Sequence, residues 1–369
     1  MASSANPKDL VVISKHDNKF TALADVLEKT AFFDILERHF KGSNKAREEF
    51  SIVIKPNIMM AYSRKDPSTI TDPELVEYLI NEIIKHGFSK ITVVESQNVF
   101  GNWFRNRDVV TVATYFGYSG SNYKIVDLTR EKVRYRFKGR LGRHWIGPTW
   151  RDADFRISFA KNKTHFSCYF TLTLKNLYGC MPLQNKFKEY HEKKEFDWPT
   201  IEMLKEFWCH YGLIDAYWSA DGLWGLKSDD TPVPTKTIIG GENIIAVETI
   251  GAKKMGLNPM QSRIYKLAVE ELQYKPDIEC QGDDSVYESW INIPPFMDKF
   301  MDVGEEFYHV SNKLGFISSE MDPFFPPKTT NPIVRGIRWL FLKIARIFSR
   351  AESQYAEWHR YVSKQIKKI

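Results

Sequence analysis

The chain has 369 residues, of which 43% are hydrophobic, 14% aromatic and 27% charged. These values are typical of globular proteins and exclude a disordered, collagen-like or simple coiled-coil chain. The formal net charge of +6 permits an anionic partner. Nucleic-acid-binding proteins usually carry a denser basic footprint, so we expect no nucleic-acid partner.

The chain contains four widely spaced cysteines, Cys168, Cys180, Cys209 and Cys280. No two of them form a CxxC pair, so the sequence contains no ferredoxin-type iron–sulfur motif and no finger-type zinc site. Scattered cysteines favour a reducing, cytoplasmic compartment over a disulfide framework. We expect no signal peptide, and no run of about 18 uncharged apolar residues predicts a spanning helix.

Short apolar runs alternate with amphipathic segments in the first part of the chain. The pattern predicts strands at 10–14, 51–54, 90–94 and 124–126, and helices at 22–40, 71–86 and 109–116. Thr71 and Glu74 have the spacing of a capping box, and Gly87 follows the same helix as a C-cap. This alternation predicts right-handed βαβ units and a parallel sheet.

Residues 131–150 interrupt the alternation, because apolar and basic residues alternate at 133–138 as in a half-exposed β-hairpin. The α/β pattern then resumes, with expected strands at 155–159, 214–219 and 237–239 and expected helices at 171–178, 199–211 and 242–255. We therefore predict an α/β fold with a mostly parallel central sheet flanked by helices, a β-hairpin insertion and a C-terminal amphipathic helix. The expected organisation is an α/β domain over 1–276, an irregular covering segment over 277–330 and a basic helical tail over 331–369.

Charged and amide side chains recur at the ends of the predicted strands. They are Lys55, Asn57, Glu95, Asp127, Lys161, Lys163, His165 and Asp221. In open α/β sheets the ligand crevice lies outside the carboxyl ends of the strands. Strand ends also meet polar loops in any such fold, so a solvated surface is the alternative. Long lysine and histidine side chains favour a shared site.

The segment around Lys161, Lys163 and His165 has the highest density of such groups. In an extended strand these three side chains point to one side, where they could bind a phosphate or a carboxylate. His165 is a candidate catalytic acid or base because its ordinary pKa is near neutral, and Lys163 is the second catalytic candidate. A solvated basic loop is the alternative interpretation.

Candidate substrate-binding residues come from three segments. Lys55, Lys161 and Lys175 could clamp the anion, while Asn57 and Asn176 could orient it. Gly179 lies one helical turn after Lys175, and a glycine there would let another group approach closely.

A divalent metal is a possible cofactor, and the cofactor is otherwise unknown. Glu95 and Asp221 are the candidate ligands, because carboxylate oxygens suit hard cations. They could equally act as counter-charges to the lysines. The sequence has no HExxH or HxxxH pattern and no Walker or GxGxxG loop, so neither zinc catalysis nor nucleotide binding is indicated.

Several of these segments resemble the bacterial and archaeal family known as domain of unknown function family 362. The matching pieces, over about residues 50–260, are 54–57 (IKPN), 71–74 (TDPE), 94–96 (VES), 161–165 (KNKTH), 174–179 (LKNLYG), 221–222 (DG) and 239–243 (IGGEN). The resemblance implies an α/β fold and a shared site but no reaction. Many relatives carry an appended ferredoxin-like cysteine segment, which this chain lacks.

Residues 331–350 have a basic amphipathic pattern. Its apolar positions are Ile333, Val334, Ile337, Leu340, Phe341, Ile344, Ile347 and Phe348, and its basic positions are Arg335, Arg338, Lys343, Arg346 and Arg350. Such a helix can lie in the interface of an anionic membrane. The alternative is a terminal helix docked on its own domain.

Two functions follow from these patterns. The first is an enzyme that acts on a small phosphate- or carboxylate-bearing substrate at the carboxyl edge of the sheet. It would be cytoplasmic and bound peripherally to the inner face of the membrane through 331–350. The alternative is a non-catalytic peripheral membrane protein that binds an anionic ligand or headgroup within an assembly.

Overall fold

The fold is known from a computed structural model of the chain. The structure describes residues 8–59, 67–98, 107–165, 168–191, 197–222 and 232–288, together with Trp290, Asn292 and Leu340. Most of the predicted covering segment and nearly all of the predicted tail lie outside the described residues. Leu340, the one described residue of the tail, has a side chain that is 52% exposed.

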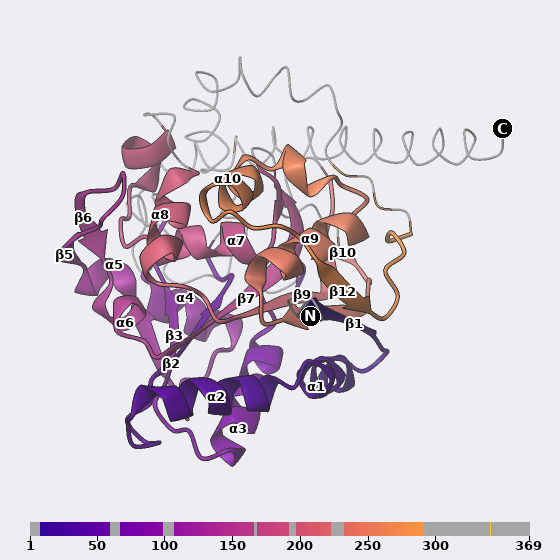
Figure 1. The fold of residues 1–369 in the computed structure, drawn as a ribbon, viewed down its shortest axis with the longest axis horizontal. Helices are drawn as coiled ribbons and strands as arrows, with labels where there is room; N and C mark the ends of the chain where they lie inside the picture. The colour runs from indigo at the N-terminus through magenta and orange to yellow at the C-terminus, as the bar shows by residue number, and fades with distance from the viewer. Residues whose placement is uncertain are drawn as a thin grey trace, which may run out of the picture.

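A long mixed sheet forms the centre of the molecule (Figure 1). Its strands are β1 (Asp9–Lys15), β2 (Ile52–Pro56), β3 (Ile91–Glu95), β4 (Lys124–Asp127), β7 (Phe155–His165), β8 (Tyr169–Thr171), β9 (Tyr211–Ala220), β10 (Pro232–Val233), β11 (Thr237–Gly241) and β12 (Ile278–Gln281). Within the described part of the chain, the strand order is β12-β1-β11-β9-β7-β2-β3-β4, and β8 and β10 pair with β7 and β9.

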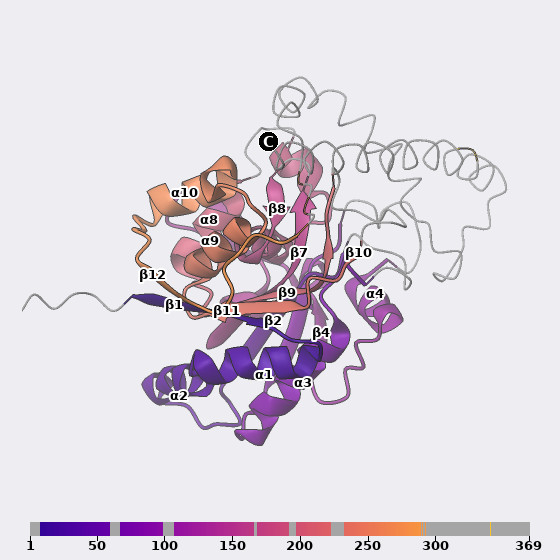
Figure 2. The same cartoon turned by 90° about the vertical axis from the view of Figure 1, so that its right-hand side faces the viewer.

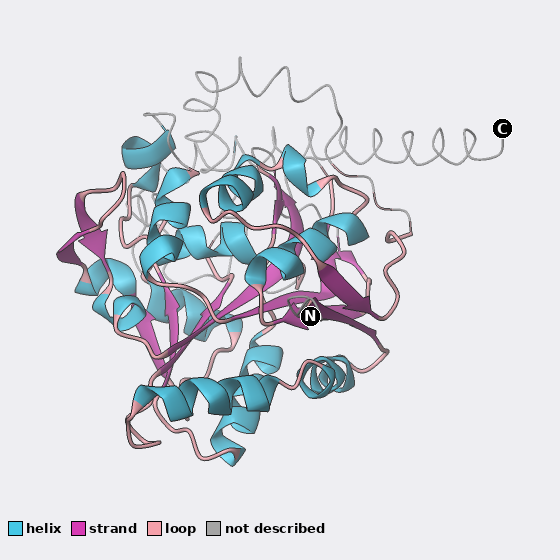
Figure 3. Ribbon diagram, viewed as in Figure 1, coloured by secondary structure: helices cyan, strands magenta, loops and turns pink. Residues whose placement is uncertain are grey.

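The strands that carry most of the predicted site run parallel. β9, β7, β2, β3 and β4 are parallel neighbours, whereas β11 is antiparallel to both β1 and β9. Parallel neighbours need crossover connections, which place helices on the faces of the sheet. Figure 3 shows helices on both sides of the strands, and the expected mostly parallel central sheet flanked by helices is confirmed.

Two groups of helices cover the sheet (Figure 2). One face carries α1 (Lys19–Lys29), α2 (Phe32–Ser43), α3 (Pro73–Lys85) and α4 (Val109–Phe116), and the other carries α7 (Thr173–Asn176), α8 (Trp198–Glu206), α9 (Ile244–Lys254) and α10 (Arg263–Glu271). The short helices α5 (Leu128–Glu131) and α6 (Pro148–Arg151) contact each other and contribute to the same core as α8 and α10. A hydrophobic core lies on each face of the sheet, and alternate residues of β2 point into different cores. Ile52 and Ile54 pack with α1–α4, and Val53 packs on the opposite face.

Several helix predictions differ from the structure, and the helix expected at 199–211 is α8, which ends at Glu206. The single helix expected at 22–40 is divided into α1 and α2 at Ala31, whose φ of +52° is left-handed and ends the first helix. The N-cap of α3 is Asp72, whose side chain accepts a bond from the backbone N–H of Glu74, so the cap predicted at Thr71 is wrong. Thr71 instead accepts from the Asn57 N–H at 2.8 Å and donates to the Phe159 carbonyl at 2.7 Å.

The expected hairpin is present as β5 (Val133–Arg136) and β6 (Arg143–Ile146), which pair in an antiparallel register. The helix expected at 171–178 is one turn of α helix, α7, followed by the 3₁₀ turn η2 (Leu177–Cys180). β12 falls inside the segment expected to be irregular, yet it pairs in parallel with β1 at the sheet edge. The sheet-forming part of the chain therefore extends past residue 276.

No helix in the described ranges is both long enough and apolar enough to cross a membrane.

Candidate functional site

The carboxyl ends of β2, β3, β4, β7 and β9 share one edge of the sheet, because these strands run parallel. The side chains at this edge come from segments that are far apart in the sequence. Lys55 lies near the end of β2, Glu95 ends β3, and Lys161 lies in the second half of β7. The tertiary structure thus brings most of the predicted polar residues to one region.

Lys55 and Glu95 form a buried ion pair. The Lys55 Nζ lies 2.7 Å from the Glu95 Oε2, and the two residues are 1% and 4% exposed. The same ammonium group donates to the Pro56 carbonyl at 2.6 Å and to the Asn176 Oδ1 at 3.1 Å. Asn176 in turn donates to the Lys55 carbonyl at 2.7 Å and to the Ser158 Oγ at 3.1 Å. Each of the three N–H groups of the Lys55 ammonium therefore donates a hydrogen bond.

Gly179 lies against this ion pair. A Cβ atom at position 179 would be 2.1 Å from the Glu95 Oε1 and 2.5 Å from the Lys55 Cε. The close approach expected of this glycine is therefore made by the two charged side chains. The Gly179 carbonyl also accepts a hydrogen bond from the Ser96 Oγ at 2.6 Å. A glycine is required here for space, since any side chain would displace the ion pair.

Asn57 connects this ion pair to Lys163. The Asn57 Nδ2 is 3.4 Å from the Asn176 Oδ1, and the Asn57 Oδ1 accepts from the Lys163 Nζ at 3.2 Å. Lys163 also donates to the Thr69 carbonyl at 3.1 Å. A continuous chain of polar contacts thus runs from Glu95 through the two asparagines to Lys163.

Lys161 is held by Asp215, a residue that the sequence analysis did not select. The two residues are paired in the register of β7 and β9, and the Lys161 Nζ lies 2.8 Å from the Asp215 Oδ2. Both are almost completely buried, at 1% and 0% exposure. Asp215 also accepts the backbone N–H groups of Asp72 and Tyr217. A lone carboxylate inside the apolar run of β9 was the signal that could have identified it.

Three more predicted site residues make contacts of other kinds. Lys175 places its ammonium group 4.2 Å from the centre of the Tyr178 ring. His165 is the last residue of β7, half-buried, and pairs with Tyr169 of β8. Asp221 follows β9, where its Oδ1 accepts the backbone N–H groups of Gly222 at 2.7 Å and of Asn292 at 2.9 Å.

The two predicted metal ligands do not fit a metal site. Glu95 directs one carboxylate oxygen to Lys55 and the other to the backbone N–H of Ser96, and Asp221 accepts from backbone groups. Nowhere in the described ranges do three or more His, Cys, Asp or Glu side chains gather in a way that could hold a metal ion. We therefore assign no step to a metal.

Glu248 on α9 holds the helix that carries Lys175 and Asn176. Its Oε2 accepts from the Thr173 Oγ1 and from the backbone N–H of Leu174, both at 2.8 Å. Its Oε1 has no hydrogen-bond partner although the residue is fully buried. Burial raises the pKa of Glu248 to about 7, against the hydrogen bonds from Thr173 and Leu174 that lower it.

Lys186 is a second residue that the sequence analysis did not select. Its Nζ donates to the carbonyl oxygen of Gln97 at 2.9 Å, and its side chain is 8% exposed. Burial lowers the pKa of Lys186 to about 7. Nothing in the local pattern of residues 181–191 distinguishes this lysine, because its hydrogen-bond partner Gln97 is 89 residues away in the sequence.

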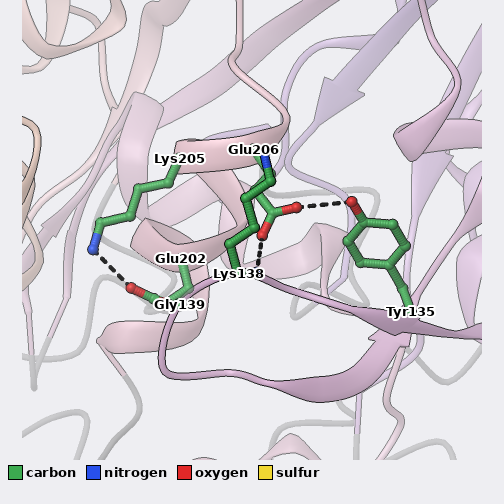
Figure 4. A pocket seen from close by; sticks show the side chains of 6 residues that line it. All are labelled: Tyr135, Lys138, Gly139, Glu202, Lys205 and Glu206. Atoms are coloured by element: carbon green, nitrogen blue, oxygen red, sulfur yellow. Dashed lines mark hydrogen bonds and ion pairs between the residues drawn. The ribbon is translucent and has the colours of Figure 1, made fainter.

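A pocket of about 460 Å³ lies elsewhere, between the β5–β6 hairpin and α8 (Figure 4). Its polar groups already pair with one another. The Tyr135 hydroxyl donates to Glu206 at 2.8 Å, and the Lys205 Nζ lies 2.8 Å from Glu202. The pocket is lined by residues of the hairpin and α8 and includes none of the predicted site residues.

The family model described as "Domain of unknown function (DUF362)" matches residues 52–253, in agreement with the resemblance noted from the motifs. No curated protein matches the sequence. Among solved structures, the lactate racemase apoprotein from Thermoanaerobacterium thermosaccharolyticum is similar, with 14% identity and a TM-score of 0.38. The similarity covers 64% of this chain and 54% of that one, so the chain spans about half of that protein's length.

Proposed function

The chain belongs to the DUF362 family, and from this premise and the geometry above we propose that it is an enzyme acting on a small anionic substrate. The substrate carries a phosphate or a carboxylate group and binds at the carboxyl edge of the sheet. The observation that carries the proposal is the buried chain of contacts from Glu95 and Lys55 through Asn176 and Asn57 to Lys163.

The energetic cost of this arrangement supports a functional role. Removing a charged group from water costs several kcal/mol even when it is paired, and a hydrophobic pair of similar volume would often be more stable. This edge buries two ion pairs, Lys55–Glu95 and Lys161–Asp215, together with Lys163. Clusters of buried ionisable groups at strand ends are typical of active sites.

Each residue has a proposed role in that site. Lys163 and His165 transfer protons to or from the bound substrate, and Lys175 supplies a positive charge for its anionic group. Asn57 and Asn176 orient the substrate through their amides. Lys55 and Lys161 are each held by a carboxylate. They clamp the anionic group of the substrate only when that group competes with the carboxylate for the lysine's hydrogen bonds.

We further propose that the enzyme is cytoplasmic and binds the inner face of the membrane through residues 331–350. The support is the basic amphipathic pattern of that segment in the sequence. The non-catalytic alternative, a peripheral protein that binds an anionic ligand or headgroup, uses the same residues and differs in having no turnover.

Anion binding can be tested by the thermal stability of the purified chain in phosphate or malonate, against chloride at equal ionic strength. A ligand that binds only the native state raises the midpoint of unfolding. We expect phosphate or malonate to stabilise the chain and the Lys163→Gln substitution to reduce this effect. Lys124→Gln is the matched control, because Lys124 begins β4 and so lies at the opposite edge of the sheet. Equal stabilisation of both variants would contradict the site.

Turnover separates the enzyme from the alternative. The chain is incubated with an extract of anionic metabolites, and their amounts are followed by mass spectrometry. An enzyme at low concentration consumes a large molar excess of one metabolite, and His165→Gln should slow this consumption by about 10²–10⁴-fold. Enrichment of a metabolite without its consumption would support the binding protein instead.

A further inference from the structure

Lys186 is a buried lysine that the proposed function does not yet use. It precedes a π-helical turn at Phe187–His191, and its side chain is 8% exposed. Lys55 and Lys161 are more deeply buried, at 1% exposure each, but each of them has a carboxylate partner. In the part of the chain that the structure describes, Lys186 has no carboxylate at ion-pair distance and donates only to the Gln97 carbonyl.

Gln97 holds the Lys186 amine against the same edge of the sheet. Gln97 follows β3 two residues after Glu95, and its side-chain amide donates to the carboxylate of Asp127 at the end of β4. The Gln97 Oε1 accepts from the Gln184 Nε2 at 2.8 Å. The contacts on both sides of Gln97 therefore fix the Lys186 amine beside the ends of β3 and β4.

The surroundings of this amine favour its neutral form. Burial lowers the pKa of Lys186 to about 7, Lys55 and Lys175 lower it too, and Glu95 and Asp127 act in the opposite direction. An unperturbed lysine has a pKa of about 10.4 and is almost entirely protonated at neutral pH. Desolvation next to other cations is a known way to turn a lysine into a nucleophile.

We propose that Lys186 captures the carbonyl group of a small anionic aldehyde or ketone as a Schiff base. The lone pair of the Nζ forms a bond to the carbonyl carbon, while the π electrons of the carbonyl bond move to its oxygen. The two hydrogens of the amine leave with that oxygen as water, and a C=N bond remains. No oxidant or reductant is needed, and addition of water reverses the step.

This inference rests on the proposed function, because Lys186 would serve the same anion-binding edge. It narrows the substrate class to anions that carry a carbonyl group. Lys175 supplies positive charge near Lys186, whereas Glu95 balances the charge of Lys55, so a ligand with an acidic group close to its carbonyl would pair with Lys175.

The test uses glyoxylate, a small anionic aldehyde, with cyanoborohydride on the full-length chain. Hydride from cyanoborohydride converts an imine into a stable secondary amine, which peptide mass mapping locates. At pH 7 we expect Lys186 to be labelled more than about tenfold faster than the exposed Lys188, since burial lowers the pKa of Lys186 to about 7. The labelling rate at Lys186 should reach half of its maximum near pH 7.

Variants separate this residue from its neighbours. Lys186→Arg removes the nucleophile but keeps a cation and should lose only the label at position 186, whereas Lys188→Arg should keep that label. If the arginine variant does not fold, the comparison of the two lysines within the wild-type chain still decides the matter. Equal labelling of Lys186 and Lys188, or no label at Lys186, would overturn the inference.

The two proposals fail in different ways. Stabilisation by phosphate without a label at Lys186 contradicts carbonyl capture and leaves the anion site in place. A label at Lys186 without stabilisation by phosphate or malonate contradicts the anion site and leaves carbonyl capture in place.

Discussion

Gly179 and Asp215 are the two residues that allow lysines to be buried at the strand ends. Gly179 leaves the space that the Lys55–Glu95 pair occupies, and Asp215 supplies the counter-charge for Lys161. One acts through volume and the other through charge, so their substitutions should affect the protein differently.

The substitution Gly179→Ala should force the Lys55–Glu95 pair apart, because the new Cβ would lie 2.1 Å from the Glu95 Oε1. We expect the free energy of unfolding to fall by about 1–3 kcal/mol in urea titrations. Gly42→Ala in α2 is the control, since nothing lies within 4 Å of its Cβ, and it should raise stability by about 0.5–1 kcal/mol. Unchanged stability of Gly179→Ala would show that the pair tolerates the methyl group.

The substitution Asp215→Asn leaves the Lys161 ammonium group buried without its counter-ion. Breaking a buried pair from one side typically lowers stability by about 3–5 kcal/mol. The double substitution Lys161→Met, Asp215→Leu removes both charges and should lose less stability than the single one, as measured by chemical unfolding. A single variant as stable as the double variant would contradict this account of the pair.

The short helix α7 depends on α9 for its position. The helix is one turn long, and its first residues bond to Glu248 of α9. So short a helix is not stable alone. Asn176 at its end connects Lys55, Ser158 and Asn57, so the position of α7 determines the arrangement of the proposed site.

The pH dependence of stability tests this role of Glu248. Its pKa is about 7 in the fold, above the ordinary value of about 4.3 for glutamate, so the native state favours the protonated form. The stability that the fold gains from a protonated Glu248 is complete below about pH 4 and is lost as the pH rises towards 7. Between about pH 4 and pH 7, the free energy of unfolding of the wild-type chain should fall by on the order of 3 kcal/mol relative to that of Glu248→Gln.

The measurement is chemical unfolding of both chains at a series of pH values. Glu248→Gln mimics the protonated side chain, so its own stability should lack this component of the pH dependence. Parallel stability curves for the two chains would contradict a shifted pKa at Glu248.

In the molecule as a whole, the sheet separates two layers of helices and extends through β12 beyond the expected domain boundary (Figure 2). The proposed function uses the polar edge of the sheet and the basic pattern of 331–350. The edge is described by the structure, whereas membrane binding by the tail is still a prediction from sequence.

Membrane association is expected to depend on the charge of the tail. The full-length chain should sediment with vesicles that contain phosphatidylglycerol and not with neutral phosphatidylcholine vesicles, and high salt should weaken binding. The triple substitution Arg335→Glu, Arg338→Glu, Arg346→Glu should abolish binding. The control reverses three exposed charges elsewhere, Lys41→Glu, Lys90→Glu and Lys124→Glu, and should retain it. Equal loss in both variants would indicate a response to net charge alone.

Much of the architecture could be predicted because it depends on local patterns. The periodicity of apolar residues indicated β1–β4, α3, α4 and the β5–β6 hairpin close to their observed bounds. Once parallel strands are expected, their carboxyl ends must share an edge, so the gathering of Lys55, Glu95, Asn57 and Lys163 followed from the order of elements alone.

The partners of these residues depended on contacts that no local pattern contains. Lys161 and Asp215 are 54 residues apart in the sequence and meet only through the register of β7 and β9. Lys186 donates to Gln97, which is 89 residues away in the sequence, and the lowered pKa of Lys186 follows from its burial. Local periodicity determines which segments become strands and helices, whereas desolvation and charge pairing are decided by which segments the tertiary fold places side by side.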